Sequence, residues 1–543
     1  MNHRTRSSFL LLAAAAALAV LSALVGCKPS APSGSLQVLH VGNSTEPADL
    51  DPQTVTGRPE SDIIRTLIEG LIIPDPKTLD PRPGVAERWE ISADGLTYTF
   101  HLRTDAVWSD GRAITSRDFV DSWKRMLTPA LAAEYAYNLY VVAGAEAYHK
   151  GRLTDFGATG FQAPDARTVR ITLDHPTSYF LNLLLHTSWY PVPLHVVEKF
   201  GGLARKGTAW TRPENHVGNG PFVLKEWRQN QKVIVARSPT YWNRAAVKLD
   251  EVHLYATDNA DTEERMFRTG QLHIARQVPL SKIDTYRTEN PAALKVEPFL
   301  ATAYVRVNTK RPHLADPRVR RALALAIDRE SLCRNVLRGT KFPARSLTPP
   351  GTAGFTPPVG FADDLAEAKK LLAEAGFPEG RGLPPIEALY PTSDNGRIIM
   401  EAIQQMWRKG LGIDARLLNQ EWKVYIDSLN TLSFDVSWSA WVGDYADPMT
   451  FLDLMTTDSG NNRTGWSNKE FDALVMEARQ SLAVPARHAL YGRLEEMLAR
   501  ESPVLPLYVY SSVSLVHPRV QGVYPTSLDV HPYNEVWLAP ESP

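Results

Sequence analysis

The feature that most constrains the fold is the alternation of strand patterns and amphipathic helix patterns along nearly the whole chain. Apolar residues recur at every second position in the strand patterns, and at every third or fourth position in the helix patterns. Strands are predicted at residues 36–42, 95–103, 166–174, 232–238, 414–420, 434–442 and 506–512. Helices are predicted at residues 115–126, 316–328, 365–377 and 486–501. Because the predicted strands and helices alternate along the chain, the sequence predicts a mixed α/β fold.

The chain is long enough for several domains around a large core. It has 543 residues, of which 43% are hydrophobic, and its sequence contains no visible internal repeat. Its 59 basic and 60 acidic residues give a net charge of -1. Because nucleic-acid binding normally needs a basic surface, this balance argues against a nucleic-acid partner.

The N-terminus carries a targeting pattern. Arg4 and Arg6 precede an apolar stretch at residues 7–26, and Cys27 follows directly. This arrangement predicts a signal peptide over residues 1–26, with a plain membrane anchor as the alternative. The run "LVGC" resembles the bacterial lipobox, in which the cysteine is lipidated, and the Pro/Ser-rich residues 27–35 predict a flexible tether. We therefore expect a periplasmic lipoprotein that is anchored to a membrane through Cys27.

Motifs for catalysis or metal binding are missing from the sequence. It contains no P-loop, HExxH, CxxC or GxSxG pattern, and its fourteen histidines are scattered singly. With Cys27 lipidated, Cys333 has no partner for an intrachain disulfide. These observations predict a protein that is not an enzyme and that uses no cofactor and no metal.

The stretch "SWSAWVGDYADPMTF", residues 437–451, places Asp444 among large aromatic rings. A carboxylate in such surroundings is costly unless a positive group meets it. The stretch itself contains no Lys, Arg or His. Asp444 is therefore predicted to need a cation from elsewhere.

Several blocks of the sequence resemble the family 5 extracellular solute-binding proteins of ABC importers, and within them the oligopeptide binders. The blocks occur in the family's order and span about residues 40–540. They are "GVAERWEISADGLTYTFHLRTDAVWSDGRAITSRDFVDSWKR" (84–125), "NGPFVLKEW" (219–227), "DPRVRRALALAIDRE" (316–330), "EAKKLLAEAGF" (367–377) and "GDYADPMTFL" (443–452).

The resemblance implies a two-lobed periplasmic-binding-protein fold of class II with an extra inserted domain and the ligand in the cleft between the lobes. The first lobe would comprise residues 36–68, 194–300 and 512–543, with the inserted domain at 69–193 and the second lobe at 301–511. It further implies a monomer that traps a peptide by hinge closure and delivers it to a membrane ABC permease.

The resemblance also implies ligand-binding residues. In the family an aspartate that matches Asp444 binds the ligand's α-ammonium, and the segment that matches Ala440 to Val442 pairs with the ligand backbone. On the opposite lobe the matching segment is "TGR", which comprises Thr56, Gly57 and Arg58, with Thr56 in place of the family's acidic residue.

Three aromatic residues belong to the same expected site. Tyr135 and Trp422 match aromatic positions near the ligand, and Trp441 is expected to line a side-chain pocket.

The chain departs from the family at the end that binds the ligand's carboxylate. Trp438 stands in place of an arginine, Gly396 stands in place of a histidine with Arg397 beside it, and Arg311 stands in place of a lysine. Ala301 and Val442 occupy the positions of the family's second-lobe disulfide. The manner of carboxylate binding is therefore open.

Three alternatives to an oligopeptide binder follow from the same residues. A murein-peptide or dipeptide binder would fit the same family and the same Asp444. A cell-wall peptidase or amidase would act on similar ligands, although the sequence offers no nucleophile or metal motif for it.

Overall fold

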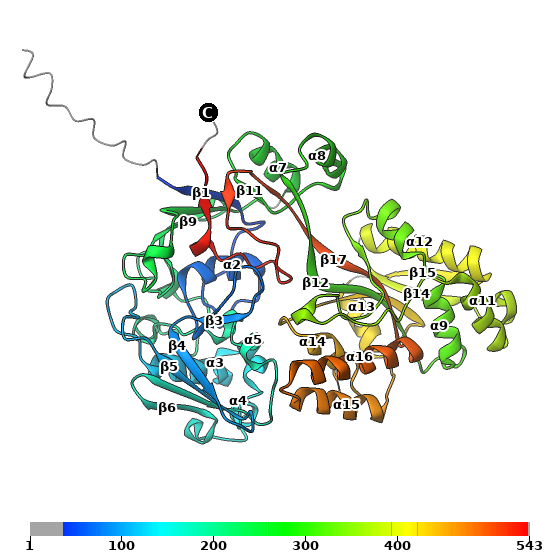
Figure 1. Cartoon of the computed structure of the whole chain (residues 1–543), viewed down its shortest axis with the longest axis horizontal. Helices are drawn as coiled ribbons and strands as arrows, with labels where there is room; N and C mark the ends of the chain where they lie inside the picture. Colours follow the sequence, from blue (N-terminus) through cyan, green and yellow to red (C-terminus); the bar gives the residue numbers. More distant parts are fainter. Residues whose placement is uncertain (1–35, 258, 393, 421, 458, 541–543) are drawn as a thin grey trace, which may run out of the picture. The chain divides into compact units, whose positions relative to one another are not determined.

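The computed structural model describes residues 36–257, 259–392, 394–420, 422–457 and 459–540, without the side chains of residues 394, 395, 422 and 423. The chain divides into two units, residues 1–37 and 38–543. The second unit contains all the elements described below and is a mixed α/β structure (Figure 1), which confirms the predicted class.

The largest sheet draws its strands from both halves of the chain. Its order is β15-β14-β16-β12-β17-β11-β1-β10-β9-β8, and β13 pairs with β17 beside this path. The strands are β1 (Val38–Gly42), β8 (Phe222–Arg228), β9 (Lys232–Arg237), β10 (Glu251–Tyr255), β11 (Ile274–Ala275), β12 (Leu294–Val307), β13 (Phe342–Pro343), β14 (Ile386–Pro391), β15 (Ala415–Gln420), β16 (Val436–Val442) and β17 (Val504–Val516). Within this sheet β12 and β17 join the β14–β16 group to the strands around β1 and β10.

The long strands β12 and β17 lie side by side (Figure 1), but their pairing is interrupted. Residues 294–298 pair with 511–515 and residues 302–306 pair with 504–509, with a register shift between Pro298 and Thr302. Inside this gap Leu300 donates its N–H to the carbonyl of Ser527 at 2.6 Å and accepts the N–H of Gly443 at 2.7 Å. The backbone of Leu300 therefore bonds to two loops instead of to β17.

A second sheet carries the order β4-β5-β7-β6. Its strands are β4 (Ala86–Ile91), β5 (Thr97–Leu102), β6 (Phe161–Asp165) and β7 (Thr168–Thr172), and helix α3 (Ser116–Leu127) packs on it. The N–H of Thr115 donates to the Asp118 carboxylate at 2.8 Å, which confirms the predicted capping box. Phe119, Trp123 and Met126 on the inner face of α3 are fully buried.

The remaining helices include those that the sequence predicted. Asp316 caps α9 with its side chain, and Gly376 follows α11 with a positive φ of 94° that favours glycine. The helices are α2 (Arg58–Leu67), α4 (Ala145–His149), α5 (Phe180–Leu183), α6 (Leu194–Val197), α7 (Ala260–Arg268), α8 (Ile283–Glu289), α9 (Pro317–Leu325), α10 (Arg329–Ser331), α11 (Leu365–Glu374), α12 (Asp394–Leu411), α13 (Trp422–Asn430), α14 (Met449–Leu452), α15 (Lys469–Gln480) and α16 (Val484–Glu501).

Two short strand pairs form separate two-stranded sheets. They are β2 (Ile72–Pro74) with β3 (Pro81–Pro83), and β18 (Val520–Gln521) with β19 (Trp537–Leu538). Among the described residues, every helix is too short or too polar to cross a membrane.

Candidate functional site

Asp444 lies in the loop between β16 and α14. Its N–H donates to the hydroxyl of Thr450 at 3.0 Å, and the preceding residue, Gly443, bonds to Leu300. The loop is thus fixed on both sides of the acid. Among the residues that the structure describes, no side chain or backbone group forms a hydrogen bond or ion pair with the Asp444 carboxylate. Burial raises the pKa of this carboxyl to about 6.

The groups around Asp444 come from distant parts of the chain. Burial, and next the negative charge of Asp444, raise the pKa values of the Tyr135 and Tyr137 phenols. Asp444 also lines a small cavity of about 30 Å³ with Arg65 and His186. The structure therefore brings Asp444 and Tyr135 close to each other.

Neither basic residue in this cavity neutralises Asp444. Arg65 donates to the carbonyl of Leu185 at 2.9 Å and to the Tyr190 hydroxyl at 3.3 Å. Burial, and next the charge of Arg65, lower the pKa of His186 to about 3, so this imidazole is neutral at physiological pH. The negative charge of the Asp444 carboxylate is therefore not balanced by a positive group among the described residues.

The strand that leads to Asp444 has a free edge. β16 pairs with β12 from Val436 to Val442, whereas β14 pairs with β16 only as far as Ser437. Gly443 donates its N–H to β12, and the carbonyl of Trp438 accepts a hydrogen bond from the Tyr425 hydroxyl at 2.7 Å. In an antiparallel pair, the N–H and C=O groups of successive residues point alternately toward and away from the partner strand. Since Gly443 points toward β12, Ala440 points its N–H and C=O away from β12.

Val442 has the same parity as Ala440, and both residues are exposed. The backbone N–H and C=O groups of these two residues thus point toward the outer edge of β16. In the described sheet, no strand pairs with this edge beyond Ser437. An extended peptide could form main-chain hydrogen bonds with these groups. Such bonds do not depend on which side chains the peptide carries.

The two tryptophans of this strand pack on opposite faces of the sheet. Trp441 packs against the cluster that contains Leu300 and Tyr445, and Trp438 packs against the cluster that contains Val305 and Trp407. Ala301 and Val442, the positions expected to carry the family's disulfide, lie directly opposite each other in the β12–β16 ladder.

The "TGR" segment leads into helix α2. Thr56 is exposed, and Gly57 forms the N-terminal cap of the helix. A Cβ at Gly57 would contact the carboxylate of Glu60, so the end of that side chain would have to move to admit a larger residue. Arg58 pairs with Asp529 and Asp62, so its charge is already neutralised.

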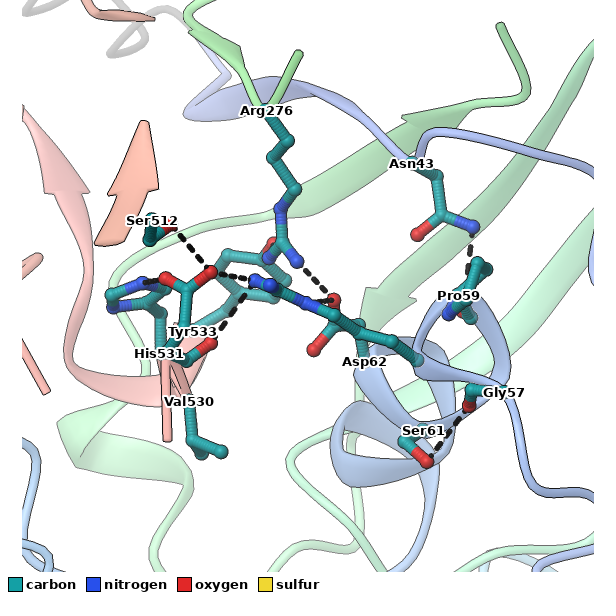
Figure 2. A network of polar contacts seen from close by, with 12 residues as sticks. Asn43, Gly57, Pro59, Ser61, Asp62, Arg276, Ser512, Val530, His531 and Tyr533 are labelled. Atoms are coloured by element: carbon teal, nitrogen blue, oxygen red, sulfur yellow. Dashed lines mark hydrogen bonds and ion pairs between the residues drawn. The ribbon is translucent and has the colours of Figure 1, made fainter. Parts of the chain in front are cut away.

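Arg58 takes part in a polar network around the start of α2 (Figure 2). Arg276 pairs with Asp62 and donates to the Tyr533 hydroxyl at 2.8 Å. Asp529 accepts from the Ser512 hydroxyl at 2.7 Å and lies 2.6 Å from the His531 ring. This network ties α2 to β17 and to the C-terminal segment.

Burial alone would raise the pKa of Asp529. The hydrogen bond with His531 and the charges of Arg58 and Arg276 outweigh burial, and together they hold this pKa well below its usual range. Asp529 is therefore ionised under all ordinary conditions.

Two of the predicted residues lie away from Asp444, and two others lie wholly or partly outside the described residues. Arg311 pairs with Asp435 at 3.0 Å, at the opposite end of β16. Arg397 lies on α12 and pairs with Glu401 at 3.1 Å. The side chain of Trp422 and the whole of Cys27 lie outside the described residues.

Sequence reasoning did not single out Tyr137, Asn182 or Tyr179. Asn182 donates to the carbonyl of Ala446 at 3.1 Å, and the Tyr179 ring stacks on Tyr445 at 4.5 Å. No local pattern connects these residues with positions more than 260 residues further along the chain. Among the described residues there is also no group of three His, Cys, Asp or Glu side chains that could hold a metal ion.

Comparison with known proteins assigns the chain to a family. The model of the bacterial extracellular solute-binding proteins, family 5 Middle, matches residues 80–463. The chain is 37% identical over 539 residues to the periplasmic oligopeptide-binding protein OppA of Escherichia coli K12, with 96% of each chain covered. It is 36% identical over 523 residues to the periplasmic murein peptide-binding protein MppA of the same organism, covering 94% of this chain and 95% of MppA.

A solved structure of similar fold is the unliganded open form of the murein tripeptide-binding protein MppA. The TM-score is 0.85 at 36% identity, with 93% of this chain and 99% of that chain covered. This similarity confirms the two-lobed periplasmic-binding-protein fold that the sequence predicted. The chain belongs to the family 5 bacterial extracellular solute-binding proteins.

Proposed function

We propose that this protein is an extracytoplasmic substrate-binding protein that captures short peptides with a free N-terminus and delivers them to an ABC-type permease. The observation that carries the proposal is the half-buried carboxylate of Asp444, unpaired among the described residues, beside the free edge of β16. The names of the relatives, which bind oligopeptides and murein peptides, support the same substrate class.

In this proposal the ligand supplies the cation that Asp444 lacks. An α-ammonium would replace the water that solvates the carboxylate and would form a charge-assisted hydrogen bond with it. The backbone groups of Ala440 and Val442 would then pair with the first residues of the ligand. Tyr135, Trp422 and Trp441 would contact its side chains, and Thr56, Gly57 and Arg58 would approach from the other lobe.

We further propose that the lobes comprise residues 36–68, 194–300 and 512–543, and residues 301–511, with residues 69–193 inserted into the first. The register gap between Pro298 and Thr302 supports a hinge at the boundary between residues 300 and 301. Closure around a ligand would be driven by contacts that form only in the closed arrangement.

The location proposed for the mature protein rests on the sequence alone. A signal peptide at residues 1–26 and lipidation of Cys27 would hold a monomer at a membrane through the tether 27–35. Mass spectrometry of the protein from a bacterial membrane fraction should detect a diacylglyceryl group on Cys27.

A murein-peptide binder is the second candidate, because the MppA relative and the loss of the arginine at Trp438 both favour an unusual ligand. A peptidase is the alternative from another class. Incubation of the purified protein with free peptides and with murein tripeptide, followed by mass spectrometry, separates these functions. Recovery of intact, co-purifying peptide supports a binding protein, and fragments that accumulate over time support an enzyme.

Peptide affinity should fall as the pH is lowered below about 6. Burial raises the pKa of free Asp444 to about 6, whereas a bound ammonium would lower it, because an opposite charge favours the ionised form. Binding in acid must therefore release a proton, and Kd should rise about tenfold per pH unit well below this pKa.

Isothermal titration calorimetry between pH 7.5 and 4.5 measures this dependence. His186 stays neutral in this range. The variant Asp444→Asn should show a flat profile, and a flat profile in the native protein would contradict the role of Asp444.

The variant Ala440→Pro should weaken peptide binding about fivefold, because it removes one backbone N–H that faces the ligand, a hydrogen bond worth about 1 kcal/mol. This N–H points away from β12, so the ladder within the sheet should persist. Titration calorimetry measures the loss. The variant Ala440→Val keeps the N–H and should lose much less affinity, and equal losses in the two variants would argue against backbone pairing.

A further inference from the structure

Arg306, on β12, is a buried arginine that has no acidic partner among the described residues. Only 6% of its surface is exposed. It donates to the hydroxyl of Ser439 at 2.9 Å and to the hydroxyl of Tyr304 at 3.0 Å, and its guanidinium lies over the Tyr304 ring. No carboxylate of the described residues lies within ion-pair distance of it.

The other buried arginines of the described chain all have such a partner. Arg125 pairs with Asp51 and Arg329 pairs with Asp363, at 2.6 and 2.7 Å. The looser pairs are Arg320 with Glu501 at 3.9 Å and Arg487 with Asp447 at 4.0 Å. Since a buried charge without a counter-ion is costly, the exception at Arg306 calls for an anion from outside the chain.

Arg463 lies on a loop that bonds to the chain just after β12, where Thr309 donates its N–H to the carbonyl of Thr464 at 2.9 Å. Burial, and next the charge of Arg306, lower the pKa of Arg463, and both arginines act on the Tyr304 phenol. Arg463 is half-buried, and its Nε is buried without a hydrogen-bond partner among the described residues. Two cations held together in this way repel each other until an anion joins them.

The arginine pair connects to the free edge of β16 through hydroxyl groups. Arg306 donates to Ser439, whose hydroxyl lies 2.9 Å from that of Tyr425. Tyr425 in turn donates to the carbonyl of Trp438 at 2.7 Å. This carbonyl is therefore already bonded and is not available to a ligand strand. The edge left for a ligand comprises the three residues from Ala440 to Val442, whose ends lie ~7 Å apart in an extended strand.

We propose that Arg306 and Arg463 form the carboxylate subsite of the peptide-binding site, at the end of the β16 edge opposite to Asp444. This inference rests on the proposed function and deepens it. The carboxylate would be either the C-terminus of a short peptide or an acidic side chain near its end. Two guanidinium groups supply paired N–H donors that match the two oxygens of a carboxylate.

This subsite would explain how the protein binds a carboxylate although Trp438 stands in place of the family's arginine. The sequence lacks an arginine at that position, but Arg306 on the neighbouring strand pairs in register with Ser437 and reaches Ser439 from the side of β12. The positive charge therefore comes from another strand, and the tryptophan packs into the core on the opposite face. The short free edge predicts a preference for peptides of about three residues.

Titration calorimetry on the native protein tests the subsite with four ligands: trialanine, N-acetyl-trialanine, trialanine amide and Ala-Glu-Ala amide. We expect trialanine amide to bind at least about 30-fold more weakly than trialanine, as for loss of one partner of a buried charge pair. Recovery of affinity with Ala-Glu-Ala amide would identify an acidic side chain as the anion, and no recovery would identify the C-terminus.

The variant Arg463→Met should bind trialanine and its amide equally, while the penalty for N-acetylation remains. Arg408→Met, on the exposed face of α12, is the matched control and should behave like the native protein. Equal binding of trialanine, trialanine amide and Ala-Glu-Ala amide by the native protein, with the N-acetyl penalty intact, would overturn the subsite alone. Failure of every free peptide to bind, or the absence of an N-acetyl penalty, would overturn the proposed function itself.

Discussion

Replacement of Asp444 by asparagine is expected to weaken peptide binding by ~2–5 kcal/mol, which corresponds to about 30-fold to several thousand-fold in Kd. The asparagine keeps the size of the side chain but removes the negative charge. The ligand's ammonium would then be buried without a counter-ion. Titration calorimetry measures the loss directly, and an unchanged Kd would refute the assignment of Asp444.

The same variant should make the unliganded protein more stable. Burial raises the pKa of Asp444 to about 6, whereas an unfolded chain has an aspartate pKa of about 3.9. A raised carboxyl pKa in the folded state means that ionisation costs stability above pH 6, and that this cost disappears below the unfolded pKa. After allowance for the partial exposure of the group, we expect Asp444→Asn to gain about 1–2 kcal/mol at pH 7.5.

Urea denaturation at two pH values separates this effect from a general change in folding. The gain should be present at pH 7.5 and absent at pH 3.5. A variant that loses affinity and gains stability identifies a residue whose charge serves the ligand rather than the fold. A loss of stability at pH 7.5 would instead mean that Asp444 has a partner within the protein.

Replacement of Asp529 by alanine is expected to destabilise the protein by ~1–3 kcal/mol, because it leaves the groups that bond to this buried carboxylate without their acceptor. Asp529 is buried, and it holds Arg58, His531 and Ser512 together. Urea denaturation at pH 7.5 measures the change in the free energy of unfolding.

The acid dependence of this effect has the opposite sign to that of Asp444. The folded-state pKa of Asp529 lies below its usual value, so its stabilisation is complete above the unfolded pKa of about 3.9 and disappears as the pH falls further. The control is Arg58→Ala, whose side chain is 45% exposed and should contribute less than about 1 kcal/mol. Equal effects of the two variants would contradict the central role of Asp529 in this network.

The sequence could predict the mixed α/β class because its strand and helix segments are strongly periodic. The capping box of Thr115 and Asp118 and the helix start at Asp316 are local signals, and each appears in the structure as predicted. Asp444 was also detectable, because a carboxylate within an aromatic stretch is unusual in any sequence. These features share one property: their cause lies within a few residues of them.

The arginine pair could not be predicted, because its cause is spatial. Arg306 and Arg463 are 157 positions apart, and their lack of acidic partners among the described residues is visible only in three dimensions. The long strand β12 was missed for a different reason. Pro298 interrupts its pattern, and the ladder shifts register at the same place.

The contacts of Leu300 have a consequence for how a ligand would be retained. This residue lies in the register gap between β12 and β17, and it bonds to Gly443, the neighbour of Asp444. Under the proposed hinge, Asp444 therefore lies close to the axis of rotation, where the displacement between open and closed states is smallest. A carboxylate near the hinge axis can bind an ammonium in both the open and the closed state. Its binding energy would then lengthen the time that a peptide stays bound, but it would not favour the closed state over the open one. Selection of the closed state would then depend on contacts far from the axis, where a small rotation produces a large displacement.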